Sequence, residues 1–160
     1  MDHQHNPFQC NLGYQVSMSG KGQWSKQTDY IGKEALEKMK EQLKNGEKPY
    51  KLQLVGLELA GGKPIEDYAN DFWLISNANG GKPVGYITSP WYHPEKKKNI
   101  AMGYVPFEGN LNKNGFPTGN FGKKYKIHLP KKYSNKPVEA VVVPVPFTES
   151  FNPNTREVKK

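Results

Sequence analysis

The sequence predicts a mainly β fold, an antiparallel β-barrel of about six strands preceded by one amphipathic α-helix. Three observations support this fold class. Clear helical periodicity is confined to residues 33–44. From residue 50 onward, apolar and polar residues alternate in short runs. Turn residues separate these runs about every ten to fifteen positions, which favours a closed or nearly closed antiparallel barrel over an open α/β sheet.

The predicted helix at residues 33–44 has one narrow apolar stripe, which makes it a surface-mounted helix. At its start, Ile31 is expected to pack against Leu36 as a hydrophobic staple. At its end, Gly46 tolerates the left-handed conformation that stops a helix. The apolar residues that recur at helical spacing are Leu36, Met39 and Leu43.

The barrel strands are expected in the remainder of the chain. In the first strand the apolar alternation changes phase at Gly56, which predicts a bulge or a sharp bend. Residues 77–81, Asn-Ala-Asn-Gly-Gly, predict a hairpin between the second and third strands. Pro144 and Pro146 cannot donate to a ladder, so the last strand should lie at an edge or leave the barrel there. The expected strands are residues 52–59, 71–76, 84–89, 99–105, 124–129 and 138–145.

The chain is expected to have three regions. Residues 1–28 form a lead-in arm, residues 29–150 hold the helix and the barrel, and residues 151–160 form a tail. Within the arm, apolar residues at 8–16 suggest a strand that has no partner in this chain, so it resembles a piece of something larger. Residues 17–28 are typical of a loop.

The charge balance argues against nucleic-acid recognition. The net charge is +8, but of the 23 basic residues 22 are lysine and only Arg156 is arginine. Arginine is the usual reader of base edges, whereas lysine acts as a point charge. The run at residues 96–98 is expected to be a solvated turn, with a surface for an anionic ligand as the alternative.

Localisation is expected to be cytoplasmic, without membrane contact. No apolar run approaches the roughly 18 residues of a membrane span. The N-terminus shows no signal-peptide pattern. The single cysteine, Cys10, excludes an internal disulfide and fits a reducing compartment.

No complete catalytic constellation is present in the sequence. It contains no nucleophile elbow, no phosphate-binding loop and no dinucleotide fingerprint. Cys10 lies five residues from His5 but has no orienting partner in view. Glu58 and residues 66–67 offer isolated carboxylates, which are expected to be solvated, and no metal site is expected at His3 and His5. The residues alone therefore predict a soluble β-rich domain without a resident active site.

Short stretches that occur in order along the chain carry a more specific signal. Tyr-Ile-Gly-Lys-Glu-Ala-Leu occupies residues 30–36, and Val-Gly-Tyr-Ile-Thr-Ser occupies residues 84–89. With the other matching stretches, they resemble the glycine-cleavage T-protein (aminomethyltransferase) superfamily over nearly the whole chain. Residues 1–10, Met-Asp-x-x-His-Asn-Pro-Phe-x-Cys, most resemble the dimethylsulfoniopropionate demethylase-like branch. The other matching stretches are residues 6–13, 54–59, 91–94, 99–105 and 143–147.

The resemblance implies that this chain is the C-terminal barrel domain of a longer enzyme. Full-length relatives transfer an aminomethyl or methyl group from a small-molecule donor to tetrahydrofolate. Their N-terminal folate-binding portion holds the catalytic aspartate, so this chain is expected to contain no catalytic residue and to be inactive alone. Its expected role is to pack against that portion and help close the folate site, without binding tetrahydrofolate tightly by itself.

The resemblance also suggests which residues approach the folate. Phe151 and Asn152 follow the Pro-Phe motif at the place where family members come close to the cofactor. The T-protein pattern favours tyrosine there, so packing is expected in place of a hydrogen bond. Trp91 and Tyr92, in a proline-rich loop, are the other candidates, because large aromatic residues can line a pocket mouth. Packing at the barrel rim is the alternative role for both.

Two other functions remain open from the sequence. The first alternative is a stand-alone binding module whose lysines engage an anionic partner. The second is an interaction domain that associates with itself through exposed apolar surface. Binding that weakens steeply with salt and depends on residues 96–98 would indicate the first. Concentration-dependent sedimentation would indicate the second.

Overall fold

The computed structural model divides the chain into two compact units. The first, here called the helical unit, consists of Met1–Gln53 and Phe107–Gly119. The second, here called the barrel unit, consists of Leu54–Pro106 and Asn120–Lys160. The expectation of a loop at residues 17–28 lies outside the described residues. The structure describes residues 5–13, 16, 30–67, 71–109, 119–145, 147, 151–152 and 157–158.

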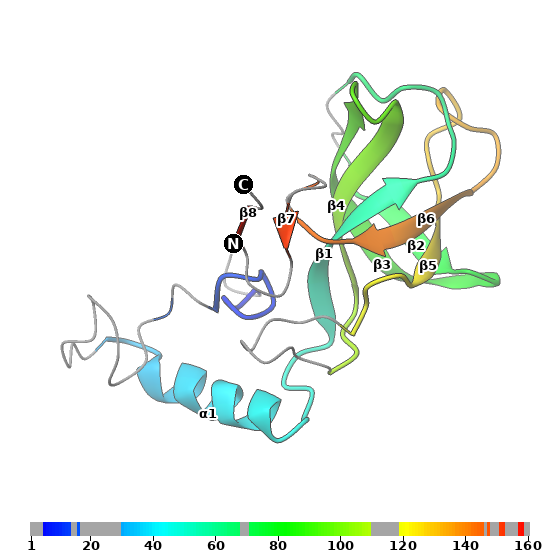
Figure 1. Cartoon of the computed structure of the whole chain (residues 1–160). Helices are drawn as coiled ribbons and strands as arrows, with labels where there is room; N and C mark the ends of the chain where they lie inside the picture. Colours follow the sequence, from blue (N-terminus) through cyan, green and yellow to red (C-terminus); the bar gives the residue numbers. More distant parts are fainter. Residues whose placement is uncertain are drawn as a thin grey trace. The chain divides into compact units, whose positions relative to one another are not determined.

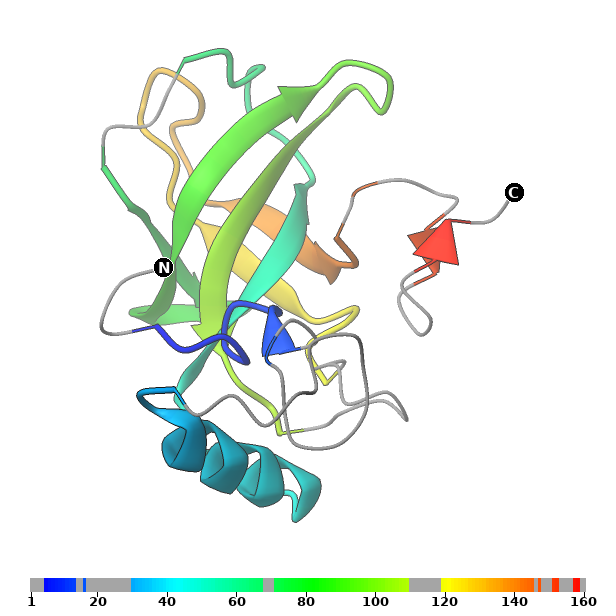
Figure 2. The same cartoon turned by 90° about the vertical axis from the view of Figure 1, so that its left-hand side faces the viewer.

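Six strands close into an antiparallel barrel in the order β1-β4-β3-β2-β5-β6 (Figure 1). The predicted fold class is therefore confirmed. The third strand is much longer than expected, and with β4 it forms the long hairpin that faces the viewer in Figure 2. The strands are β1 (Leu52–Leu59), β2 (Trp73–Asn77), β3 (Gly80–His93), β4 (Lys98–Pro106), β5 (Lys124–Ile127) and β6 (Val138–Val143).

The interior of the barrel is filled by apolar side chains. Strand residues alternate between the two faces of a sheet, and here the inward positions carry aliphatic and aromatic groups. Burial of these groups is the main force that stabilises the closed barrel. The largest fully buried ones include Leu57, Ile65, Ile75, Ile87, Val105 and Ile127.

The pairing of β1 with β6 shows no bulge from Gly56 onward, whereas the predicted alternative of a sharp bend stays a prediction. The pairing of β1 with β6 continues in register from Gly56↔Val143 to Leu59↔Ala140. Gly56 has another role, because a Cβ atom at this position would lie 2.7 Å from Val145 Cγ2 and 3.0 Å from Phe147 Cε1. The chain that follows β6 thus crosses β1 where a side chain is lacking. Since β6 ends at Val143, directly before the first proline, the expectation that the chain leaves the barrel there is confirmed.

The only α-helix among the described residues is α1 (Lys33–Lys44), with the bounds that the periodicity predicts. Gly46 adopts φ 78°, so the predicted left-handed stop is confirmed. The predicted staple is wrong, because Ile31 is fully exposed. The predicted strand at residues 8–16 is also wrong in its described part, which forms turns, with the Leu12 N–H donating to the Pro7 carbonyl at 2.8 Å.

A small apolar cluster organises the helical unit. Tyr50 and Phe107 stack with ring centroids 4.5 Å apart. Burial raises the pKa of the Tyr50 hydroxyl well above its usual value. The apolar stripe of α1 packs against this cluster, as expected for a surface-mounted helix. The cluster comprises Phe8, Leu43, Tyr50 and Phe107, with Leu36 and Met39 packed against it.

Candidate functional site

Trp91 and Tyr92 lie in β3, next to the turn that leads into β4. Their expected place in a loop is wrong, because Trp91 pairs with Ile100 and Tyr92 with Asn99. Trp91 is 53% exposed, whereas Tyr92 is half-buried. Neighbouring residues in a strand face opposite sides, so the two aromatic rings do not line the same surface.

A buried amide fixes the loop beside this strand end. Asn99 is 3% exposed, and its Oδ1 accepts a hydrogen bond from the Ile65 N–H at 3.0 Å. Its Nδ2 donates to the carbonyls of Gly61 (3.2 Å) and Lys63 (3.0 Å). The Tyr92 N–H donates to the Ile65 carbonyl at 3.0 Å. These bonds hold Ile65 among the core side chains at this end of the barrel.

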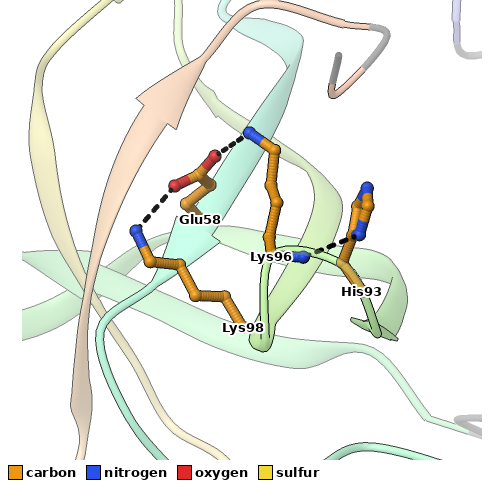
Figure 3. A network of polar contacts seen from close by, with 4 residues as sticks. All are labelled: Glu58, His93, Lys96 and Lys98. Atoms are coloured by element: carbon orange, nitrogen blue, oxygen red, sulfur yellow. Dashed lines mark hydrogen bonds and ion pairs between the residues drawn. The ribbon is translucent and has the colours of Figure 1, made fainter. Parts of the chain in front are cut away.

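A carboxylate bridged by two lysines lies at the same end (Figure 3). Glu58 accepts a hydrogen bond from Lys96 Nζ at 2.8 Å and another from Lys98 Nζ at 3.2 Å. The backbone N–H of Lys96 donates to His93 Nδ1 at 3.4 Å. The expected solvated turn is confirmed at Lys97 and Lys98, which are exposed. The expectation of solvated side chains is wrong for Glu58 and Lys96, which are only 19% and 25% exposed.

The two lysines also set the charge state of this carboxylate. The hydrogen bond from Lys96, the largest cause, holds the pKa of Glu58 below its usual range, and Lys98 adds to the effect. Glu58 is therefore an ionised structural anchor at neutral pH. Because Lys96 and Lys98 both pair with Glu58, the run of lysines presents less positive charge to an anionic ligand than its sequence suggests.

A second ion pair fastens the neighbouring loops of the barrel unit. Asp67 accepts from Lys132 Nζ at 2.6 Å and from the Tyr133 hydroxyl at 3.2 Å. Both charged side chains remain more than half exposed, in keeping with the solvated carboxylate expected there. The hydrogen bond from Lys132 lowers the pKa of Asp67, and the reciprocal bond raises the pKa of Lys132.

One pairing that the sequence did not suggest joins Ser76 and His128. Ser76 Oγ lies 3.0 Å from His128 Nε2. Ser76 is fully buried, so its hydroxyl is inaccessible to a substrate and the pair has a structural role. Its residues are 52 positions apart, and only the pairing of β2 with β5 brings them together. No local pattern in the sequence could have revealed it.

The remaining candidates lie elsewhere. Phe151 and Asn152 form β7 (Phe151–Asn152), which pairs with β8 (Glu157–Val158). Cys10 is half-buried in the turns of the helical unit, where its N–H donates to the Asn6 carbonyl. Within the described part of the chain, no group of three or more His, Cys, Asp or Glu residues is arranged to hold a metal ion.

The fold and this end of the barrel define a class, that of closed six-stranded antiparallel barrel domains with a side-chain-filled interior. Residues 53–148 match the family described as glycine cleavage T-protein C-terminal barrel domain. The chain belongs to this family, and the resemblance of its motifs to the T-protein superfamily is confirmed, while the likeness of residues 1–10 to the demethylase-like branch stays a prediction. No helix in the described part is long and apolar enough to cross a membrane.

Known relatives are considerably longer than this chain. An aminomethyltransferase from Desulforamulus reducens is 31% identical over 143 residues, which are 89% of this chain and 30% of that protein. An aminomethyltransferase from Symbiobacterium thermophilum is 36% identical over 104 residues, which cover 64% of this chain and 23% of that protein. The crystal structure of aminomethyltransferase T from Bartonella henselae shares the fold, with TM-score 0.55 and 21% identity, over 89% of this chain and 32% of that one. The chain thus spans less than a third of these relatives.

Proposed function

We propose that this chain is the C-terminal barrel portion of a tetrahydrofolate-dependent aminomethyl- or methyltransferase. In this role it helps to close the folate site, while the catalytic residues come from the folate-binding portion that precedes the barrel in longer proteins. The match of residues 53–148 to the barrel family, within relatives of which this chain spans less than a third, supports this role. A cytoplasmic location and a small-molecule one-carbon donor belong to the same proposal.

The packed interior of the barrel favours a role in which the barrel covers a folate site that lies outside it. A barrel can house a ligand only if side chains leave space, and here core residues such as Leu57, Ile75 and Ile127 fill the inside. Ile65 adds to the filling at the end closed by the Asn99 bonds. Any contribution to a folate site must therefore come from the outside of the barrel or from its connecting segments.

Trp91 is the side chain in the barrel strands that best fits tetrahydrofolate. Its exposed indole can stack on a planar ring of the cofactor. Tyr92, Phe151 and Asn152 remain the other proposed contacts. Tetrahydrofolate itself would carry the one-carbon group, and this chain would contribute packing and exclusion of water around it.

A chimera tests the proposal. This chain replaces the matching 143 residues of the Desulforamulus reducens aminomethyltransferase, and one-carbon transfer to tetrahydrofolate is measured. We expect activity from the chimera and none from the isolated chain. A chimera carrying Ile75→Asp, which disrupts the barrel core, is the inactive control.

Two results would contradict the proposal. Robust turnover by the isolated chain would place the catalytic residues inside it. A well-folded but inactive chimera would argue against the covering role. The Trp91 contact is tested separately, because Trp91→Ala should raise the KM for tetrahydrofolate in the chimera more than it lowers kcat, whereas a rim-packing role should change neither.

A further inference from the structure

The outer face of β2 and β3 carries large apolar side chains. Leu74 pairs with Tyr86, and Tyr86 pairs with Tyr104 on the next strand, so the three share one face. Phe72 stacks on Tyr86 with ring centroids 5.2 Å apart. Phe72 is 67% exposed and Leu74 is 49% exposed, whereas Trp73 between them points into the core. We call Phe72, Leu74 and Tyr86 the apolar face.

Such a face needs an explanation in a barrel that folds in water. Outward positions of antiparallel strands are usually polar. Scattered exposed apolar residues are ordinary, but adjacent ones that form a patch mark an interaction site. The stacking of Phe72 on Tyr86 also arranges the patch before any partner arrives, which reduces the entropy lost on binding.

A cationic border lies on one side of the apolar face. Ile127 pairs with Ile75 across β5 and β2, and both lie in the core, so the preceding Lys126 points outward, as Leu74 does on β2. Glu139, which pairs with Lys126 on β6, bonds to Lys124 at 3.0 Å instead. Lys126 therefore makes no ion pair with another described residue. Within the part of the chain that the structure describes, its charge is therefore not neutralised by an ion pair of its own.

The charge selects the kind of partner. The chain carries a net charge of +8. A second copy would bring like charge to the same surface, and Lys126 would gain no counter-ion from an equivalent lysine. A partner with carboxylates would gain attraction both from Lys126 and from the net charge. Asp71 precedes Phe72 at the other end of the face, so the carboxylates should lie on the Lys126 side.

We propose that the apolar face is a docking surface for an acidic polypeptide partner, which places an apolar side chain over Phe72 and Leu74 and a carboxylate beside Lys126. This surface is distinct from the residues proposed for tetrahydrofolate. The inference does not depend on the folate role.

Peptide selection tests the inference. Random twelve-residue peptides displayed on phage are selected on the immobilised full chain, and enriched peptides are synthesised for calorimetric titration. We expect the enriched peptides to combine aromatic or aliphatic residues with Asp or Glu. Leu74→Thr should weaken their binding by about tenfold, because Leu74 lies at the centre of the patch. Lys126→Gln should weaken it by about threefold and reduce its salt dependence.

Matched controls make the result decisive. Lys131→Gln removes an exposed charge from the β5–β6 connection and should leave peptide affinity unchanged. Circular dichroism verifies that each variant keeps the wild-type melting temperature, and Phe72→Ser provides a second probe of the face if Leu74→Thr is less stable. Absence of enrichment, enrichment of peptides without acidic residues, or equal binding by a folded Leu74→Thr variant would each overturn the proposal. Dimerisation of the wild-type chain that Leu74→Thr abolishes would overturn it in favour of a second copy.

Discussion

The barrel unit and the helical unit bury apolar surface in different ways. In the barrel unit, strands pair around a closed ring, and aliphatic side chains from every strand meet in one cluster. In the helical unit, a single helix stripe packs against a few aromatic rings. Hydrophobic stabilisation grows with the apolar area removed from water, so most of the stability should reside in the barrel.

Buried amides show the same difference on a smaller scale. In the barrel unit, Asn99 ties a loop to strands that are already paired on both sides. In the helical unit, Gln53 Nε2 donates to the Gln9 carbonyl at 2.9 Å and to Asn11 Oδ1 at 2.8 Å. Loss of the first amide should loosen one loop of a stable barrel. Loss of the second should open the turns of a less stable unit.

The largest expected effect tests the barrel core. Ile75 is completely buried, so Ile75→Ala should lower the free energy of unfolding by about 3 kcal/mol through lost transfer energy and the cavity left behind. Leu74→Ala, one residue away on the exposed face, should cost less than about 1 kcal/mol. Urea denaturation followed by circular dichroism measures both. Equal losses would show that the outer face is as tightly packed as the core.

Asn99→Ala should lower the free energy of unfolding by a smaller amount, about 2 kcal/mol. The reason is that the Ile65 N–H and two loop carbonyls lose a buried hydrogen-bond partner. Amide hydrogen exchange should accelerate at Ile65 while core amides of the barrel stay protected. Asn79→Ala, in the exposed hairpin turn, is the control and should change neither quantity. Unaltered exchange at Ile65 would mean that the loop is held by other contacts.

Gln53→Met keeps the volume of the side chain but removes its hydrogen-bond donors, the Nε2 hydrogens. It should lower the free energy of unfolding by about 1.5 kcal/mol. The effect should be confined to the helical unit, with faster hydrogen exchange at Leu12, whose N–H lies in the turns that Gln53 holds. The unfolding midpoint of the barrel should stay unchanged. A shift of that midpoint would show that the units unfold together, which would end the distinction drawn between them.

The elements that sequence analysis predicted correctly depend on local patterns. Helical spacing alone located α1, and alternation with turn residues located the six strands, because each pattern reflects which side of an element is buried. Gly56 shows no bulge in the pairing of β1 with β6, and its lack of a side chain instead leaves room for Val145 and Phe147, which approach it only after the barrel closes. The place of Trp91 was wrong because nearby prolines indicated a loop, whereas Pro90 is accommodated within β3.

The site contacts were harder to predict, because they join distant positions. Glu58 and Lys96 are 38 residues apart, and each alone resembles a solvated surface charge. Their pairing depends on the adjacency of β1 and β4, which the sequence does not specify. Motif resemblance gave the family correctly because it uses the order of short stretches along the chain and needs no knowledge of contacts.

The smallest expected effect concerns this charge cluster and its dependence on pH. In the folded chain, the hydrogen bond from Lys96 lowers the pKa of the Glu58 carboxyl. In the unfolded chain, the pKa of this carboxyl returns to about 4.3. The unfolded state therefore binds more protons than the folded state between these two pKa values. The stabilisation by the Glu58 ion pairs is fully present above the pKa of the unfolded state, and it is lost as the pH falls through the pKa of the folded state. Glu58→Gln should lower the free energy of unfolding by about 1 kcal/mol at pH 7.

The difference between the wild type and Glu58→Gln should shrink toward zero as the pH falls through the lowered pKa of Glu58, because the protonated carboxyl no longer attracts the lysines. Glu139→Gln is the matched control, since its ion pair with Lys124 is about half exposed and should contribute less than about 0.5 kcal/mol. Urea titrations of the three proteins between pH 3 and pH 8 provide the comparison. A Glu58→Gln deficit that stays constant over this range would mean that hydrogen-bond geometry, and not charge, holds the β3–β4 turn to β1.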